Sequence, residues 1–235
     1  MRLDEPLKNR RLKILCLHGT GTNSEVFEAQ TAALRYQLGE TFEYDFVDGE
    51  YHCSAARGIS EIFGDDQIYY SYFDGSADSA MKATRDLLAY TDENGPFDAV
   101  MGFSLGAALA VMLLLHVNQL QAAGEQIPVR LPFKCAILLC GVLPYSLTEL
   151  QRGQKKLLHP EETGAIIRIP TVHAWSPNDV DYPGHSRLLM QMCDPAKRVD
   201  IAHCVGHGVP SRGEELIKLA QAICSAVGGI SELDM

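Results

Sequence analysis

Short apolar runs alternate with amphipathic segments along almost the whole chain. Each run is apolar at nearly every position rather than at every second one, which is typical of parallel strands buried on both faces. We therefore expect strands at residues 12–17, 43–47, 97–103, 134–140, 170–175 and 198–204.

The segments between these runs show helical periodicity. Residues 76–90 place Ala80, Ala83 and Leu87 on one face and stop at an Asn-Gly-Pro sequence, and residues 211–223 repeat the pattern near the end of the chain. An Ala- and Leu-rich helix is expected from Leu105 to about Val117. Alternating strands and helices predict an α/β fold, a doubly wound and mostly parallel sheet flanked by helices.

Length and connections indicate one domain over residues 1–235, because single α/β domains often reach this size. Two connections, 49–75 and 141–164, exceed the usual length for such a sheet. Long excursions from strand ends commonly shape a ligand crevice, so we expect both to form pocket walls or a lid.

Composition and charge restrict the binding partners and the cellular compartment that we expect. A formal charge of −10 argues against nucleic-acid binding, and no apolar run reaches the length of a membrane span. Seven cysteines, an odd number without CxxC spacing, indicate reduced thiols. Because the N-terminus also lacks a secretory apolar region, a cytoplasmic protein is expected.

One serine stands between two glycines at the junction of a predicted strand and a predicted helix. Gly102-Phe103-Ser104-Leu105-Gly106 fits the GxSxG nucleophile elbow in the strand–turn–helix context that the motif requires. Side chains at the two glycine positions would collide with the neighbouring strand and helix. The motif predicts Ser104 as a nucleophile.

A serine nucleophile needs a base and an acid, here in the chain order serine, acid, histidine. His207 lies in a glycine-flanked loop after the last strand and is the predicted base, whereas His203 and His173 fit packing positions. Asp179, just after the strand at 170–175, is the predicted acid, with Asp181 as the alternative. The acid would hold the imidazole in its productive tautomer.

An oxyanion hole is expected from backbone N–H groups. Leu105 follows the nucleophile, and Thr20 lies in the loop after the first strand. The same loop contains Gly19-Thr20-Gly21, part of a dinucleotide fingerprint, but its third glycine is replaced by Ser24. No triphosphate or metal motif is present, so no cofactor and no metal are expected.

Four motifs in this order, LCLHGTGTN, VMGFSLGAALA, the Asp179 loop and HCVGHGVP, resemble the FSH family of serine hydrolases, a branch of the α/β-hydrolases. The resemblance covers nearly the whole chain and implies the α/β-hydrolase fold with a triad of Ser104, Asp179 and His207. Many members carry Pro-His after the Val47-Asp48 pair, whereas this chain has Gly49-Glu50. It thereby looks closest to fungal members of polyketide pathways, which act as esterases or thioesterases.

We therefore expect a serine hydrolase that cleaves an ester or thioester of a medium-sized acyl or polyketide group through an acyl-enzyme, with an acyl carrier protein of a polyketide synthase as a candidate partner. Alternatives are a non-catalytic ligand-binding module and a general carboxylesterase or lipase outside biosynthesis. The aromatic segment 69–73 and the turn 143–145 are the expected walls of the acyl pocket, and core packing is the competing interpretation of each residue. The residues predicted to bind substrate are Tyr70, Tyr72, Phe73, Leu143 and Pro144.

Overall fold

A six-stranded parallel sheet forms the centre of the computed structural model, which describes residues 10–124 and 133–228. The strand order is β2-β1-β5-β6-β7-β8, and every adjacent pair is parallel. All six predicted strands are confirmed, within a few residues at their ends. Their bounds are β1 (Leu12–Leu17), β2 (Phe42–Val47), β5 (Ala99–Phe103), β6 (Cys135–Leu139), β7 (Thr171–Trp175) and β8 (Arg198–Ala202).

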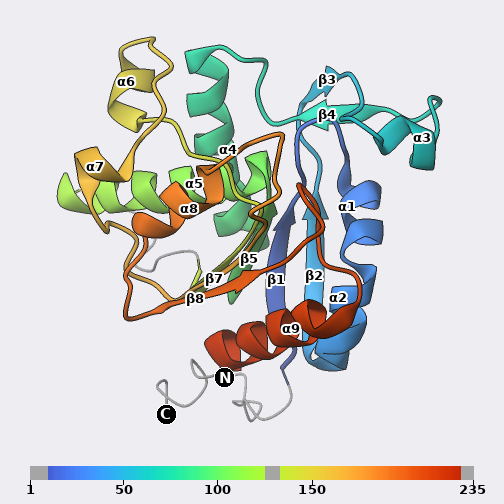
Figure 1. The fold of residues 1–235 in the computed structure, drawn as a ribbon. Helices are drawn as coiled ribbons and strands as arrows, with labels where there is room; N and C mark the ends of the chain where they lie inside the picture. Colours follow the sequence, from blue (N-terminus) through green and yellow to red (C-terminus); the bar gives the residue numbers. More distant parts are fainter. Residues whose placement is uncertain (1–9, 125–132, 229–235) are drawn as a thin grey trace, which may run out of the picture.

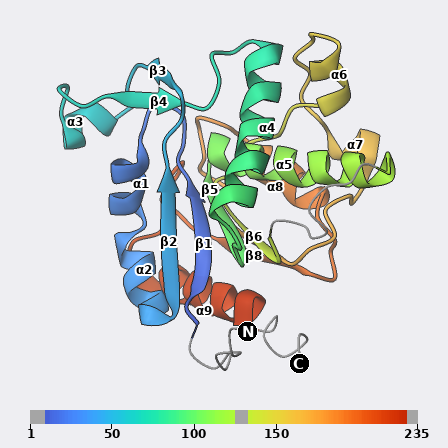
Figure 2. The same cartoon turned by 180° about the vertical axis from the view of Figure 1, so that it is seen from behind.

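Helices cover both faces of the sheet, which confirms the doubly wound α/β arrangement (Figures 1 and 2). One layer contains α4 (Ala77–Asn94), α5 (Leu105–Ala122) and α8 (His185–Gln191). The other contains α1 (Ser24–Gln30), α2 (Ala32–Leu38), which is followed by the short turn η2 (Gly39–Thr41), and α9 (Gly213–Gly228).

Neighbouring residues of a strand face opposite helical layers. In β1, Leu15 and Leu17 belong to the core beneath α4 and α5, whereas Ile14 and Cys16 belong to the core beneath α1, α2 and α9. All four are fully buried. Successive side chains of the strand face opposite sides of the sheet, and both sides are buried. The sequence of the strand is therefore apolar at every position rather than at every second one.

Helix α5 is the one described helix that is long and apolar enough to cross a membrane. Its residues from Gly106 to Val117 are all buried, and it packs against β5, β1, β6 and α4. Packing on every side explains its continuous apolar character, which is that of a core helix.

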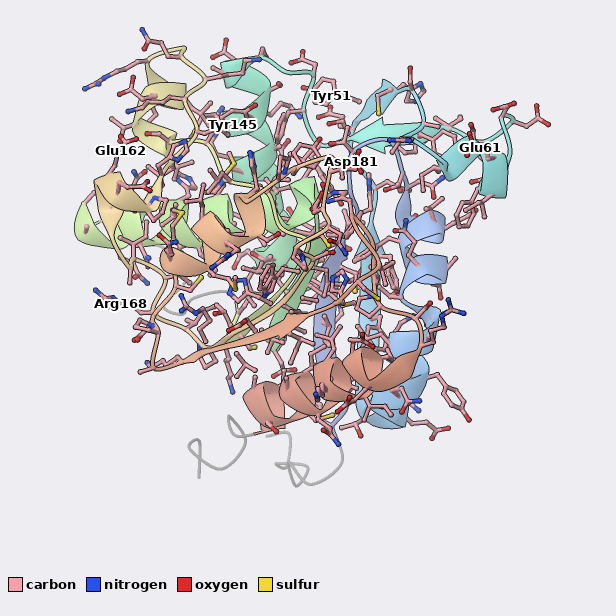
Figure 3. All side chains as sticks on the ribbon, viewed as in Figure 1. Tyr51, Glu61, Tyr145, Glu162, Arg168 and Asp181 are labelled. Carbon is pink, nitrogen blue, oxygen red and sulfur yellow. The ribbon has the colours of Figure 1, made fainter. Side chains whose placement is uncertain are left out.

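Both long connections begin at the carboxyl end of a strand, the first after β2 and the second after β6. Residues 49–75 contain β3 (Tyr51–Cys53), α3 (Ile59–Phe63) and β4 (Tyr69–Ser71), and residues 141–164 contain α6 (Leu147–Gln151) and α7 (Pro160–Thr163). In Figure 3 the side chains of Tyr51, Tyr145 and Asp181 lie toward the same upper end of the molecule. Three separate connections therefore build this end.

Candidate active site

Ser104 occupies a sharp turn between β5 and α5. Its backbone has φ 53° and ψ −113°, in the left-handed region that residues other than glycine rarely adopt. A Cβ atom on Gly102 would lie 2.5 Å from the backbone of Gly106 and Ala107, and one on Gly106 would lie 2.2 Å from the Leu17 carbonyl oxygen. Both positions of the motif therefore require glycine, because neighbouring backbone atoms leave no room for a side chain.

Three side chains distant in the sequence form a hydrogen-bonded chain at this turn. His207 Nε2 lies 2.9 Å from Ser104 Oγ, and His207 Nδ1 lies 2.8 Å from Asp179 Oδ2. Ser104 and Asp179 are buried, and the His207 side chain is 11% exposed. Because the carboxylate accepts at Nδ1, the neutral ring carries its proton there and presents its Nε2 lone pair to the serine hydroxyl.

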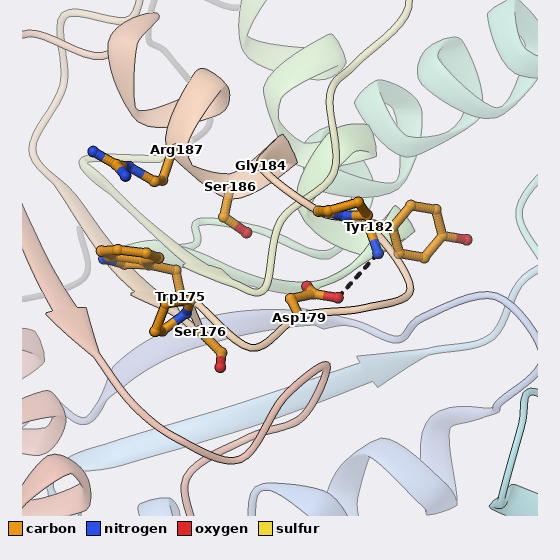
Figure 4. A pocket seen from close by; sticks show the side chains of 9 residues that line it. Trp175, Ser176, Asp179, Tyr182, Gly184, Ser186 and Arg187 are labelled. Carbon is orange, nitrogen blue, oxygen red and sulfur yellow. Dashed lines mark hydrogen bonds between the residues drawn. The ribbon is translucent and has the colours of Figure 1, made fainter.

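Backbone groups fix the Asp179 carboxylate in the loop after β7. Its Oδ1 accepts hydrogen bonds from the N–H groups of Asp181 and Tyr182, at 3.1 and 3.0 Å. This carboxylate borders a small cavity of about 220 Å³. Figure 4 shows the side chains that line this cavity. The alternative acid, Asp181, is exposed and contributes its backbone N–H to Asp179.

The loop that carries His207 is held by Cys140, the residue after β6. Cys140 Sγ lies 3.6 and 3.3 Å from the carbonyl oxygens of Gly206 and Gly208, which flank His207. The Cys140 sulfur also lies 3.6 Å from His203 Nε2. His203 Nδ1 accepts the Val205 N–H, so the neutral ring carries its proton on Nε2 and donates it to the sulfur.

Cys140, Asp179 and His207 also bring three potential metal ligands within 4.8 Å of one another. Burial raises the pKa of the Cys140 thiol to about 12, and the nearby Asp179 carboxylate adds to this rise. All three groups take part in the hydrogen bonds that hold His207 and its loop.

His18 and Thr22 orient the loop after β1. His18 Nε2 accepts the Gly49 N–H at 2.9 Å, so the neutral ring donates from Nδ1 to the Gly19 carbonyl oxygen at 2.7 Å. Burial lowers the His18 pKa and favours this neutral form. The Thr22 hydroxyl donates to the same oxygen at 2.6 Å. The Gly19–Thr20 peptide plane is thus fixed from its carbonyl side.

A cavity of about 470 Å³ opens beside Ser104 and His207. Thr20 lines it, together with residues from α1, from the segment 54–59 and from the Asp179 loop. The lining residues are Gly19, Thr20, Gly21, Thr22, Gln30, Ser54, Ala55, Ala56, Arg57, Ile59, Phe103, Ser104, Asp181, Tyr182 and His207. Part of the 49–75 excursion therefore borders the cavity, whereas no residue of 141–164 does.

The five residues predicted to bind substrate are absent from this lining. Phe73 and Leu143 are buried in the core beneath α4 and α5, and Pro144 is buried as well. The Tyr72 hydroxyl donates to the Val47 carbonyl and accepts the His18 N–H. Tyr70 pairs through its backbone with Thr22. Burial of Tyr72, Phe73, Leu143 and Pro144 favours core packing, the competing interpretation of these residues.

Several residues at the site carried no signal in the sequence. Cys140 resembled any buried cysteine, and Gln30 ended an ordinary helix. Arg57 lies in a connection without periodicity and is exposed at the cavity. The segment 54–59 reaches Ser104 because it packs on the loop after β1. The Ala56 N–H donates a hydrogen bond to the Gly21 carbonyl oxygen in this loop.

The chain resembles solved α/β-hydrolase structures over nearly its full length. A carboxylesterase from Mesorhizobium loti aligns with a TM-score of 0.60 at 16% identity, covering 92% of this chain and 90% of that one. SOBER1 of Arabidopsis thaliana aligns with a TM-score of 0.58, also at 16% identity, over 93% of this chain and all of that one. These likenesses establish the α/β-hydrolase fold.

Sequence comparison gives the family. The model of the family described as serine hydrolase (FSH1) matches residues 8–219. Esterase FPY3 of Fusarium mangiferae is 40% identical over 202 residues, covering 85% of this chain and 88% of that protein. The dihydromonacolin L-[lovastatin nonaketide synthase] thioesterase of Aspergillus terreus is 25% identical over 88% of each chain. A family match of this extent, together with an esterase relative at 40% identity, places the chain in the FSH1 family of serine hydrolases.

Proposed function

We propose that the chain hydrolyses an ester or thioester of a medium-sized acyl group, with Ser104 as nucleophile, His207 as base and Asp179 as the residue that orients His207. The observation that carries this proposal is the unbroken hydrogen-bonded chain from Ser104 Oγ through His207 to Asp179. This geometry supports Ser104 as an activated nucleophile, because a base lies within hydrogen-bond distance of the serine hydroxyl and an acid orients that base.

Ser104 Oγ attacks the substrate carbonyl carbon while its proton passes to His207 Nε2. The resulting imidazolium is stabilised by Asp179 Oδ2 at 2.8 Å. Collapse of the tetrahedral intermediate expels the alcohol or thiol, which takes the proton from His207 and leaves the acyl group on Ser104. A water molecule then attacks the acyl-enzyme with the same base, and the acid and free Ser104 are released.

The negative charge on the carbonyl oxygen would be received by the N–H groups of Leu105 and Thr20. Leu105 is the first residue of α5, where backbone N–H groups have no partner within the helix. In a trans peptide the N–H points away from the C=O, so bonding of the Gly19 carbonyl to His18 and Thr22 turns the Thr20 N–H away from these side chains. Such fixed donors are typically worth about 3–4 kcal/mol each.

Release of an acyl chain from a carrier protein is a second candidate, and it would use the same site. A relative at 25% identity bears the name of a thioesterase of a polyketide synthase, lovastatin nonaketide synthase. The charge of −10 opposes contact with an acidic carrier, so docking would need a local basic patch. Faster turnover of a carrier-bound thioester than of the same acyl group on a small thiol would support this role.

The reaction is also proposed to occur in the cytoplasm. All seven cysteines are free thiols in the structure, and four of them are buried. Reduced thiols suit a reducing compartment. Cell fractionation of the tagged chain would test the assignment, and accumulation outside the cell would contradict it.

The triad is tested with p-nitrophenyl esters and acyl thioesters of several chain lengths, using wild type and Ser104→Ala. We expect kcat to fall by about 10⁴-fold or more, because no other group can form the acyl-enzyme. The exposed Ser211→Ala is the matched control and should retain full activity. A fluorophosphonate should label wild type but not Ser104→Ala. Folded wild type that neither reacts nor is labelled would favour a non-catalytic binding module.

A further inference from the structure

Two aromatic rings contact the imidazole ring of His207. The centroids of the Phe103 and Tyr182 rings lie 5.1 and 5.0 Å from the centroid of the His207 ring, at interplanar angles of 44° and 48°. An aromatic ring attracts a cation within about 6 Å of its centroid, because the face of the ring carries negative charge. Both contacts therefore suit the imidazolium that the proposed reaction forms on His207.

Phe103 belongs to the core. It is 5% exposed and packs on Phe27, with the ring centroids 6.3 Å apart. Gly19 lies close against its ring, since a Cβ atom on Gly19 would lie 2.8 Å from Phe103 Cδ1. Core packing thus explains where the Phe103 ring lies.

Tyr182 lies in the loop after β7 and is 39% exposed, so burial in the core does not explain the place of its ring. Its N–H donates to Asp179 Oδ1 at 3.0 Å (Figure 4). Its ring also contacts the edge of His185, with centroids 5.7 Å apart, and His185 Nδ1 accepts the Leu143 N–H at 3.3 Å. Tyr182 therefore contacts the acid of the triad through its backbone and the base through its ring.

We propose that Tyr182 is a positioning residue for His207. Its ring holds the imidazole toward Ser104 and stabilises the imidazolium that forms when the Ser104 proton passes to His207 Nε2. The inference rests on the proposed function and adds a residue to it. The ring of His207 is charged only after this proton transfer, so the contact strengthens in the transition state and raises kcat rather than the affinity for substrate.

A different role has to be separated by experiment, because Tyr182 also lines the cavity beside Ser104. Tyr182→Leu removes the ring but keeps an apolar side chain and the N–H that bonds to Asp179. We expect kcat to fall about fivefold, which corresponds to about 1 kcal/mol, with KM unchanged. The loss should be equal for p-nitrophenyl acetate and p-nitrophenyl octanoate, because the ring acts through His207. A loss confined to KM or to the longer ester would make Tyr182 a wall for substrate and overturn the proposal.

Two variants control these kinetics. Tyr182→Phe keeps the ring and should retain the kcat of wild type; a fall equal to that of Tyr182→Leu would contradict a role of the ring. Tyr36→Leu removes a ring that is 84% exposed on α2, and should also leave kcat and KM unchanged. Equal thermal unfolding of the variants excludes a folding defect.

Proton NMR in the Ser104→Ala background separates this inference from the proposed reaction. The Nδ1 proton that His207 shares with Asp179 gives a downfield resonance, which is assigned by its loss in His207→Gln. Its exchange with water requires the imidazole to leave Asp179, so exchange should be faster with Tyr182→Leu than with Tyr182→Phe. An unchanged exchange rate overturns the proposal. Faster exchange in a protein that hydrolyses no ester would refute only the proposed reaction, since Tyr182 would still hold His207.

Discussion

Gly49 shows how one residue links the loop after β1 to the 49–75 excursion. Its N–H donates to His18 Nε2, and a Cβ atom at this position would lie 2.4 Å from the Ser71 carbonyl oxygen. A proline has no N–H, so it could not set the tautomer of His18 in this way.

Cys140 gives a prediction at the same scale. Cys140→Ala removes the sulfur between His203 and the carbonyls that flank His207, so His207 is held less firmly over Ser104. We expect kcat to fall about fivefold, as for one lost hydrogen bond, with KM unchanged. Steady-state kinetics on a p-nitrophenyl ester measure both constants.

Two further variants control this experiment. Cys140→Ser keeps a donor and an acceptor and should restore part of kcat. Cys193→Ala removes another buried thiol, which bonds to the Leu189 carbonyl away from the triad, and should leave kcat near wild type. An unchanged kcat in Cys140→Ala would show that the His207 loop does not depend on the sulfur.

At the scale of elements, the β5–turn–α5 unit shows why the serine could be identified from sequence. The strand, the turn and the helix are contiguous, and the glycine requirements follow from close contacts within the unit and with β1. Local chemistry therefore specified the position and backbone conformation of Ser104. The order of serine, acid and histidine was predicted from the fold in which the nucleophile elbow occurs, and each of the three residues follows the end of its own strand.

Gly106→Ala tests this unit. The added Cβ would lie 2.2 Å from the Leu17 carbonyl oxygen and 2.7 Å from that of His18, so α5 must move away from β1. We expect the free energy of unfolding to fall by about 1–3 kcal/mol, with reduced fluorophosphonate labelling. Urea denaturation measures the first effect. Gly228→Ala, whose Cβ would meet nothing within 4 Å, is the control, and equal stability of the two variants would contradict the packing argument.

At the scale of the whole molecule, the parallel sheet brings the residues of the site together at one end. The loops after β1, β5, β6, β7 and β8 supply Thr20, Ser104, Cys140, Asp179 and His207 to one region. Parallel strands all end at the same edge, so residues distant in sequence meet there. The same burial that builds the sheet also places titratable groups in its core.

Burial of His173 in β7 predicts acid sensitivity of the fold. Burial, together with the nearby Arg198 charge, lowers the His173 pKa to about 3, whereas an unfolded histidine has a pKa near 6.5. Between these values the unfolded chain binds a proton that the folded protein does not. The free energy of unfolding should therefore fall as pH decreases below about 6.5, by about 1.4 kcal/mol per pH unit for this one proton.

Urea denaturation at a series of pH values measures this slope. His173→Gln removes the titrating group and should reduce the slope by about 1.4 kcal/mol per pH unit, the contribution of one proton. The variant should also be less stable at neutral pH, because the His173 side chain is buried. An identical pH dependence in wild type and His173→Gln would contradict the assignment to this residue.

The sequence by itself determined the strands, the α/β class and the turn at Ser104. These features follow from periodicity and from backbone constraints that act within a few residues. The sequence predicted Asp179 and His207 as partners of Ser104, with Asp181 as the alternative acid, and the tertiary structure brings the side chains of Ser104, His207 and Asp179 within hydrogen-bond distance. Only the tertiary structure decided which side chains line the cavity. It buried Phe73 and Leu143 in the core and brought Gln30 and Arg57 to the site. Cavity walls depend on how separate connections pack together, and a composition rich in aromatic residues fits a core as well as a pocket.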